Sequence, residues 1–260
     1  MRWALGLEYD GRMHCGWQSQ PSGCSVQDKL EVALSAVAQD EIAVIAAGRT
    51  DAGVHAYGQV VHFQSDVERP QTAWIRGVNA HLPETIRVLW AQPVPEDFHA
   101  RFSATARSYR YVLYNHPIRP ALAAGKAGWF HEYLDAHAMA LAAESLLGEH
   151  DFSSFRAAEC QAKSPIKLMH QANVFRQGQF VIFDFTANAF LHHMIRNVVG
   201  CLVYIGAGRQ PVTWISQLLD ARDRKSAAPT FSPDGLYLTG VRYDARFGLP
   251  EVSGGAFVFL

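Results

Sequence analysis

The sequence predicts a mixed α/β (α+β) fold of two related halves, and three observations support that prediction. Segments with the two-residue alternation of strands and segments with the 3.6-residue stripe of helices follow one another in the order β-α-β-β-α-β. The same order occurs a second time in the remainder of the chain. A length of 260 residues, 49% of them hydrophobic, suffices to bury the core of one large domain or two ordinary ones.

The first half, residues 1–104, begins with a strand over Arg2–Tyr9. Ser25-Val26-Gln27-Asp28 is a capping box, which marks the start of a helix. The apolar stripe of that helix comprises Val26, Leu30, Ala33, Leu34 and Val37. We expect further strands at Ile42–Ala47, at Gln59–Gln64 with Val61 and Phe63 on one face, and at Thr85–Ala91, and a second helix at Thr72–Ala80.

The second half, residues 105–260, repeats this order. Strands are expected at Arg107–Tyr114, Leu168–Arg176, Gln179–Ala187 and Leu236–Tyr243, the middle two forming a hairpin around Gln177-Gly178. Asp135 caps a helix that carries Met139, Ala142, Ala143, Leu146 and Leu147 and ends at Gly148. A long helix has its stripe at Leu191, Met194, Ile195, Val198, Val199, Leu202 and Val203, and another helix spans Thr213–Asp220. Two such units predict ferredoxin-like (RRM-like) halves, joined into a mixed, mainly antiparallel sheet with a central cleft.

Composition excludes several classes of protein. A chain this apolar, with a formal net charge of -1, is not disordered. The most apolar segment, Val198–Ala207, covers about half of the roughly 20 residues that a bilayer requires, so we expect no membrane span. Glu8 and Asp10 follow the first apolar residues too closely for a secretory signal, so we expect a cytoplasmic location.

The balance of 23 Lys and Arg against 24 Asp and Glu means that any nucleic-acid partner must be held by a local cluster of cations. The candidate clusters are Arg101, Arg107 and Arg110; Arg196 with Arg209; and the run Arg222-Asp223-Arg224-Lys225. The four cysteines are Cys15, Cys24, Cys160 and Cys201, and they form no C-x-x-C pair. Their spacing predicts reduced, structural thiols rather than a zinc knuckle or a disulfide framework.

The most informative loop is Ala46–Ala56, which joins the two middle strands of the first half and holds Asp51 between Gly48 and Gly53. If the segment is extended, Arg49 and Asp51 lie on one face, where the guanidinium keeps the carboxylate ionised. Such a carboxylate is suited to act as a nucleophile, a base or a metal ligand. The plainer alternative is an aspartate that only caps a turn.

The segment Gly48–Ala56, which reads Gly-Arg-Thr-Asp-Ala-Gly-Val-His-Ala, resembles the signature of the TruA family of tRNA pseudouridine synthases. The resemblance covers nearly the whole chain. Its other segments are Tyr9-Asp10-Gly11, Gly16-Trp17-Gln18, Gly77-Val78-Asn79, Leu82-Pro83, Phe98–Ala104, Arg107–Tyr111, His150–Phe155, Phe190–Asn197 and Gly235–Leu238. Several segments in the order of the family are far more specific than any one of them.

The resemblance implies the pseudouridine synthase fold and a homodimer that isomerises uridines 38, 39 and 40 of the tRNA anticodon stem-loop without a cofactor or a metal. By that resemblance, Asp51 is the catalytic aspartate, Tyr109 the active-site tyrosine and Arg196 the arginine that pairs with the aspartate. Arg49 resembles the arginine that helps to displace the target base. Ser108 departs from the family, in which a second basic residue often stands beside the tyrosine, and this puts one RNA contact in doubt.

The remaining predicted RNA contacts are cationic or imidazole side chains. They are Arg107, Arg110 and His193. We expect Arg196 on the polar face of the long helix, with His192 four residues earlier, and the two histidines facing RNA or satisfied in the core. Without the resemblance, Tyr109 is more simply a half-buried tyrosine of a sheet.

Two other classes of function are compatible with the residues. The first is an RNA-binding module without catalysis, since paired ferredoxin-like sheets also serve as RNA platforms. A carboxylate at Asp51 argues against it, because a carboxylate repels phosphate. The second is a metal-dependent hydrolase that uses Asp51 with His55, His62 or His193.

Overall fold

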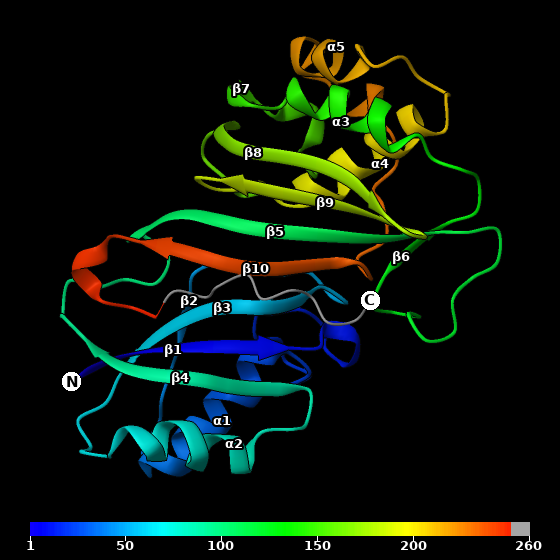
Figure 1. Ribbon diagram of the computed structural model, residues 1–260. Helices are drawn as coiled ribbons and strands as arrows, with labels where there is room; N and C mark the ends of the chain where they lie inside the picture. The colour runs from blue at the N-terminus through cyan, green and yellow to red at the C-terminus, as the bar shows by residue number, and fades with distance from the viewer. Residues whose placement is uncertain (251–260) are drawn as a thin grey trace. The chain divides into compact units, whose positions relative to one another are not determined.

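The computed structural model describes residues 1–250, which fall into two compact units (Figure 1). Unit 1 comprises Met1–Thr105 and the described residues from Tyr237 on, and unit 2 comprises Ala106–Leu236. The division near residue 105 lies next to the predicted seam. It differs from the predicted halves at the last strand, which belongs to unit 1 rather than to the second half.

Unit 1 is a sheet in the order β4-β1-β3-β10, with helices on one face (Figure 1). Its strands are β1 (Arg2–Tyr9), β2 (Ile45–Ala46), β3 (His55–Gln64), β4 (Ile86–Val94) and β10 (Leu236–Tyr243). Its helices are α1 (Val26–Ala38) and α2 (Val78–His81), with the one-turn π-helix η2 (Ala73–Gly77) and the 3-10 turns η1 (Gly11–Met13) and η5 (Ala245–Phe247). Strand β1 pairs antiparallel with both β3 and β4, whereas β10 pairs parallel with β3.

Local patterns explain much of unit 1. The predicted capping box is present, because the Ser25 hydroxyl accepts from the Asp28 amide and the Asp28 carboxylate accepts from the Ser25 amide. The prediction for Ile42–Ala47 was wrong in length, since only Ile45 and Ala46 pair as a strand. The predicted helix Thr72–Ala80 is a π-turn followed by one turn of α-helix.

Strand β3 is buried on both faces, whereas the sequence predicted one. On the helix side, Phe63 packs edge-on against Trp74 of η2, with ring centroids 5.0 Å apart. On the other side, Val60 belongs to a separate buried cluster that includes Phe98 and Phe247. Loops from distant parts of the chain therefore form a second layer over this face of β3. A strand that is buried on both faces does not show the alternation of polar and apolar residues found in a strand with one face in water.

Unit 2 is a sheet in the order β5-β9-β8-β7, covered by helices α3, α4 and α5 (Figure 1). Its strands are β5 (Ala104–Asn115), β6 (Gly128–Phe130), β7 (Gly148–Asp151), β8 (Ile166–Gln177) and β9 (Phe180–Ala187). Its helices are α3 (Ala136–Glu144), α4 (Met194–Gly206) and α5 (Trp214–Ala221), with 3-10 turns η3 (Ser153–Phe155) and η4 (Arg224–Ser226). The β8/β9 hairpin and the Asp135 cap are as predicted. Because α3 ends at Glu144, Leu147 lies beyond its stripe and is 45% exposed, contrary to the prediction.

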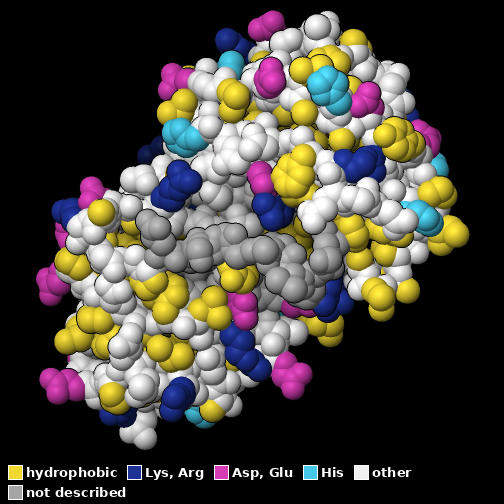
Figure 2. All heavy atoms as spheres, in the orientation of Figure 1, with side chains coloured by type: hydrophobic (Ala, Val, Ile, Leu, Met, Phe, Trp, Pro, Cys, Tyr) yellow, Lys and Arg dark blue, Asp and Glu magenta, His cyan; other side chains and the backbone are white. Residues whose placement is uncertain are grey.

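The mixed α/β class predicted from the sequence is thus confirmed. Among the described residues, no helix is long and apolar enough to cross a membrane. On the face drawn in Figure 2, Lys and Arg side chains are scattered among Asp and Glu side chains rather than gathered in one broad patch. An anionic partner therefore has no broad basic field to meet on this face, and local groups must recognise it.

Candidate active site

Asp51 lies half-buried on the turn that leads into β3, and backbone hydrogen bonds shape this turn. The Ala47 amide donates to the Val60 carbonyl at 2.8 Å, which fixes where the loop leaves the sheet. The Val54 amide donates to the Asp51 carbonyl at 3.1 Å and closes the turn. Arg49, two residues before Asp51, is exposed.

A buried polar network supports the turn from below. The Tyr9 hydroxyl, at the end of β1, lies 2.8 Å from Thr50 Oγ1, and Gln59 of β3 donates from Nε2 to the Gly48 carbonyl at 2.8 Å. Gln59 Nε2 also lies 3.5 Å from the Tyr9 hydroxyl. Burial raises the pKa of Tyr9 to about 12, against the lowering effect of its hydrogen bonds, so the phenol is protonated at neutral pH. Gly48 and Thr50, which both precede Asp51, are thereby anchored to two strands of the sheet.

A second segment, Cys15-Gly16-Trp17, packs against the same turn. The Trp17 amide donates to the Thr50 carbonyl at 2.9 Å. Gly16 has a φ of +95°, and a Cβ atom there would lie 2.8 Å from the Thr50 carbonyl oxygen. Only glycine combines this backbone conformation with so close an approach. The turn is therefore held from the side as well as from below.

The prediction of reduced thiols was wrong for two cysteines. Cys15 and Cys24 form a disulfide, with their Cα atoms 5.6 Å apart. The loop between them folds back on itself, since the Cys15 amide donates to the Cys24 carbonyl, and this brings together two residues that sequence spacing leaves unpaired. Cys160 and Cys201 are free and buried, as expected of structural thiols.

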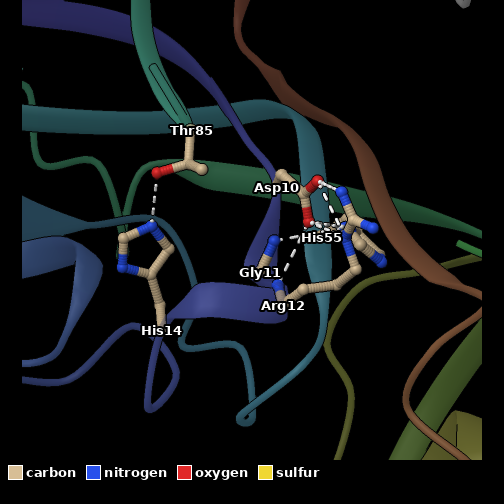
Figure 3. Close-up of polar contacts among 6 residues, drawn as sticks. All are labelled: Asp10, Gly11, Arg12, His14, His55 and Thr85. Atoms are coloured by element: carbon tan, nitrogen blue, oxygen red, sulfur yellow. Dashed lines mark hydrogen bonds and ion pairs between the residues drawn. The ribbon is translucent and has the colours of Figure 1, made fainter. Parts of the chain in front are cut away.

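On the far side of the turn, His55 begins β3 and meets the end of β1 (Figure 3). Its Nδ1 atom accepts from the Gly11 amide at 3.2 Å and lies 3.3 Å from Asp10 Oδ1. Arg12 donates to both oxygens of Asp10, from Nε to Oδ1 at 3.0 Å and from Nη2 to Oδ2 at 2.6 Å. Partial burial alone raises the pKa of Asp10, but the hydrogen bonds from Arg12 outweigh it and hold that pKa below its usual value.

Two of the histidines named in the hydrolase alternative make hydrogen bonds to the backbone. His55 is 3% exposed, and its Nδ1 lone pair is engaged by the Gly11 amide. His62 is 4% exposed and its Nδ1 accepts from the Ala100 amide at 3.1 Å, while burial lowers its pKa to about 4. Of the three histidines offered as partners of Asp51 in that alternative, His55 and His62 therefore serve the backbone of unit 1.

In unit 2, strand β5 presents its predicted site residues on two different faces. Arg107 and Tyr109 share one face, because side chains two apart point the same way. Tyr109 is half-buried, and its ring packs edge-on against Phe190 with centroids 5.1 Å apart. Arg107 donates to the Asn188 carbonyl at 2.9 Å.

Arg110 points to the opposite face of β5. It makes a two-pronged ion pair with Asp184, its register partner on β9, with N···O distances of 2.7 and 2.8 Å. This pairing with Asp184 raises the pKa of the guanidinium. The structure therefore brings Tyr109 together with Arg107 and not with Arg110.

Arg196 lies half-buried in the first turn of α4, and its Nε donates to the Phe231 carbonyl at 2.9 Å. The Phe231 amide donates back to the Arg196 carbonyl at 3.2 Å, so the helix start and the 231 segment are tied together. The prediction that His192 and His193 are part of the helix was wrong. His193 is the residue before α4, with a φ of +60°, and its ring lies 3.9 Å from that of His192.

The basic run 222–225 contains one residue with a structural role that the sequence did not indicate. Arg224 donates to Asn197 Oδ1 at 3.0 Å and to the Ala228 carbonyl at 2.8 Å. Asn197 is fully buried and also donates to the Phe155 carbonyl at 2.8 Å. The sequence did contain a signal for this role: Asn197 is a polar residue among the apolar residues of α4, and a buried amide needs hydrogen-bond partners.

The residues that sequence reasoning missed at the Asp51 turn are Tyr9 and Gln59. Gln59 is a fully buried amide next to Val60 and Val61 of β3, and Tyr9 is a buried tyrosine at the end of β1. Only the fold shows that these two residues meet beneath Asp51.

An aspartate held on a rigid turn is the arrangement typical of enzymes that act through a carboxylate. Comparison with known proteins identifies the family. Residues 7–103 and 142–244 match the family described as tRNA pseudouridine synthase, and the chain belongs to that family.

Many relatives cover almost the whole chain. The chain is 62% identical over 250 residues to the tRNA pseudouridine synthase A of Methylobacillus flagellatus, covering 96% of both chains. It is 61% identical over 251 residues to the protein of the same name from Dechloromonas aromatica, again covering 96% of both. The corresponding protein of Paraburkholderia xenovorans is 56% identical over 255 residues, which cover 98% of this chain and 94% of the relative. The resemblance seen in the sequence is thereby confirmed.

Proposed function

We propose that this chain converts uridine to pseudouridine in the anticodon stem-loop of tRNA, at positions 38, 39 and 40, with Asp51 as the reacting carboxylate. Family membership supports the reaction and the tRNA substrate. The observation that carries the role of Asp51 is its support: buried side chains fix the turn from below, and Gly16 and Trp17 fix it from the side. A capping aspartate needs no such scaffold, whereas a reacting group gains from being held still.

The reaction is an isomerisation. The N1 to C1′ glycosidic bond breaks, the uracil turns, C5 bonds to C1′, the proton on C5 leaves, and N1 takes up a proton. All atoms and electrons of the substrate are retained, so the chemistry itself requires no redox cofactor and no second substrate. Asp51 has two available roles, covalent attack on the sugar or base, or removal of a sugar proton to give a glycal.

Tyr109 and Arg196 have complementary roles in this proposal. The Tyr109 ring, braced edge-on by Phe190, stacks on the displaced uracil or accepts the proton from C5. Arg196 pairs with Asp51 and keeps the carboxylate ionised among phosphates, while its bond to the Phe231 carbonyl limits the motion of the guanidinium.

The target uridine must leave its stack before its C1′ can be reached, which costs a few kcal/mol. Arg49 is exposed on the loop beside Asp51 and is suited to fill the vacated space. Arg107 and His193 contact the RNA backbone in this proposal. Arg110 is assigned a lesser role, since Asp184 already binds both prongs of its guanidinium.

We further propose a homodimer that binds one tRNA with both subunits, and a cytoplasmic location. Sedimentation of the purified chain with and without tRNA tests the assembly. A monomer that retains full activity at all protein concentrations would exclude the dimer as the working form. Fractionation of the native cell tests the location.

The test of Asp51 is the Asp51→Asn variant, assayed on unmodified tRNA transcript with pseudouridine scored by position. This substitution keeps the shape of the side chain and removes its charge, so we expect tRNA binding to persist and turnover to fall by more than about 100-fold. Asp66→Asn, at an exposed aspartate of the same unit, is the matched control. Turnover by Asp51→Asn within about tenfold of the parent would exclude the carboxylate as the reacting group.

The same assay separates the alternatives. An RNA-binding module would bind the transcript and form no pseudouridine even as the parent protein. A metal-dependent hydrolase would lose its activity in a strong chelator, whereas the isomerase keeps it.

A further inference from the structure

The disulfide between Cys15 and Cys24 joins two parts of unit 1 that meet beside the Asp51 turn. Cys15 directly precedes the segment Gly16-Trp17, which packs against that turn. Cys24 directly precedes Ser25, the N-cap of α1. The disulfide therefore links the start of a helix to the segment that holds the turn from the side.

Backbone hydrogen bonds connect the same two parts of unit 1 alongside the disulfide. The Val26 amide donates to the Gly16 carbonyl at 3.1 Å, and the Gln27 amide donates to the Trp17 carbonyl at 3.1 Å. These bonds remain possible when the disulfide opens. A disulfide restricts the motion of the chain between its ends, so its loss should loosen the Gly16-Trp17 segment without releasing it.

Of the four cysteines, the two in the disulfide are the accessible ones. Cys15 is exposed and Cys24 is half-buried, whereas the free thiols of Cys160 and Cys201 are buried. Thiol–disulfide exchange requires an attacking thiolate to reach one of the two sulfur atoms. The structure therefore offers Cys15 Sγ to a thiol in solution.

The second sulfur atom has a hydrogen-bond donor beside it. Ser22 Oγ lies 3.0 Å from Cys24 Sγ, and because a disulfide sulfur carries no proton, the hydroxyl is the donor. A donor in this position stabilises the negative charge that develops on Cys24 when the bond to Cys15 breaks. The exposed sulfur is thus suited to be attacked and the other to leave.

We propose that the Cys15–Cys24 disulfide is a reversible redox-modification site, opened by a cellular dithiol, and that its opening slows the reaction at the Asp51 turn. The proposal rests on the proposed function of that turn. In the cytoplasm proposed above, glutathione and thioredoxin-type proteins keep thiols reduced. Disulfides that form there are usually transient and catalytic or redox-sensing, and exposed ones are the labile ones.

The exchange takes place in two balanced steps. One thiolate of the dithiol bonds to Cys15 Sγ, the disulfide bond breaks, and Cys24 leaves with the electron pair and takes up a proton. The second thiolate of the dithiol then attacks the mixed disulfide, and Cys15 leaves in the same way. Two electrons pass to the protein, the dithiol becomes a disulfide, and its two thiol protons end on the two cysteines.

The test compares the oxidised parent with the parent reduced by dithiothreitol, on unmodified full-length tRNA transcript. Alkylation followed by mass spectrometry counts the free thiols of each preparation. Reduction should lower kcat by about 3- to 30-fold and leave the Kd for tRNA within about twofold. The expected loss is below the roughly 100-fold that a misplacement of about 1 Å costs, because the backbone bonds remain. Oxidation with diamide should restore kcat.

Serine variants provide the matched controls. Cys15→Ser and Cys24→Ser leave the loop open permanently, so each should have the kcat of the reduced parent in both buffers. Cys160→Ser makes the same chemical change at a cysteine outside the disulfide and should keep the parental ratio of oxidised to reduced kcat.

Three outcomes would overturn the proposal. The first is a parent whose Cys15 and Cys24 stay reduced after oxidation. The second is an equal kcat for the oxidised and reduced parent, with alkylation showing the disulfide in one and not in the other; this result leaves the proposed function intact. The third is a changed Kd with unchanged kcat, which would make the loop a contact for RNA. A parent that forms no pseudouridine in either redox state would instead refute the proposed function, and the redox control with it.

Discussion

Tyr9→Phe removes one oxygen atom from beneath the Asp51 turn and tests whether that turn must be held rigidly. The hydroxyl is buried, lies 2.8 Å from Thr50 Oγ1 and is within 3.5 Å of Gln59 Nε2. Loss of a buried hydrogen bond that leaves its partner unsatisfied costs about 1–3 kcal/mol, so the free energy of unfolding should fall by that amount. Phenylalanine fills the same space, so little packing is lost.

The effect on catalysis should exceed the effect on binding. A turn that has lost one anchor lets the Asp51 carboxylate leave its productive position, and small displacements of a reacting group cost about 10- to 100-fold in rate. We therefore expect kcat to fall by about that factor, with the tRNA dissociation constant within about twofold of the parent. Single-turnover rates on transcript measure the effect on catalysis, and urea unfolding followed by fluorescence measures the unfolding free energy.

Two controls make the result specific. Tyr114→Phe removes an exposed hydroxyl whose hydrogen bond to Gln179 is also 2.8 Å long, and it should change stability by less than about 0.5 kcal/mol. Thr50→Val removes the partner, so the double variant with Tyr9→Phe should lose less stability than the sum of the two single variants. If Tyr9→Phe keeps the parental kcat and unfolding free energy, or if the two losses are additive, the network does not position Asp51.

Three further predictions concern other contacts of the described residues. Gly16→Ala should lower both kcat and stability, because its Cβ would lie 2.8 Å from the Thr50 carbonyl oxygen. Gly23→Ala, also at positive φ but with nothing within 4 Å of its Cβ, should lose less stability. Equal losses of unfolding free energy in urea would refute the contact of Gly16 with Thr50. The lowered pKa of Asp10 stabilises the fold above its unfolded pKa of about 3.9, and this stabilisation should be lost as pH falls through the lower folded pKa. Arg12→Gln should remove that part of the acid sensitivity, so identical pH–stability curves for variant and parent would count against the ion pair. Arg224→Gln should lower the unfolding free energy by about 1–3 kcal/mol, because it removes a charged donor from Asn197 Oδ1 and from the Ala228 carbonyl. Lys225→Gln, at the exposed neighbour, should have almost no effect on the unfolding free energy.

The sequence alone determined the elements whose signals are local. Strands β1 and β10 have the predicted bounds, and the capping box at Ser25 begins α1 as expected. These succeed because alternation, helical stripes and caps depend on residues within one or two turns of each other. The resemblance also identified the family, because its motifs occur in order along the chain.

Only the tertiary structure decided how those elements meet. The sequence assigned β10 to the second half, yet it pairs parallel with β3, because strand pairing is set by contacts between residues far apart in the chain. For the same reason, the sequence did not predict that β3 is buried on both faces, that Cys15 bonds to Cys24, or that Arg110 is occupied by Asp184. The support of the Asp51 turn by Tyr9 and Gln59 is likewise a product of register between β1 and β3, because these two residues are fifty positions apart in the chain.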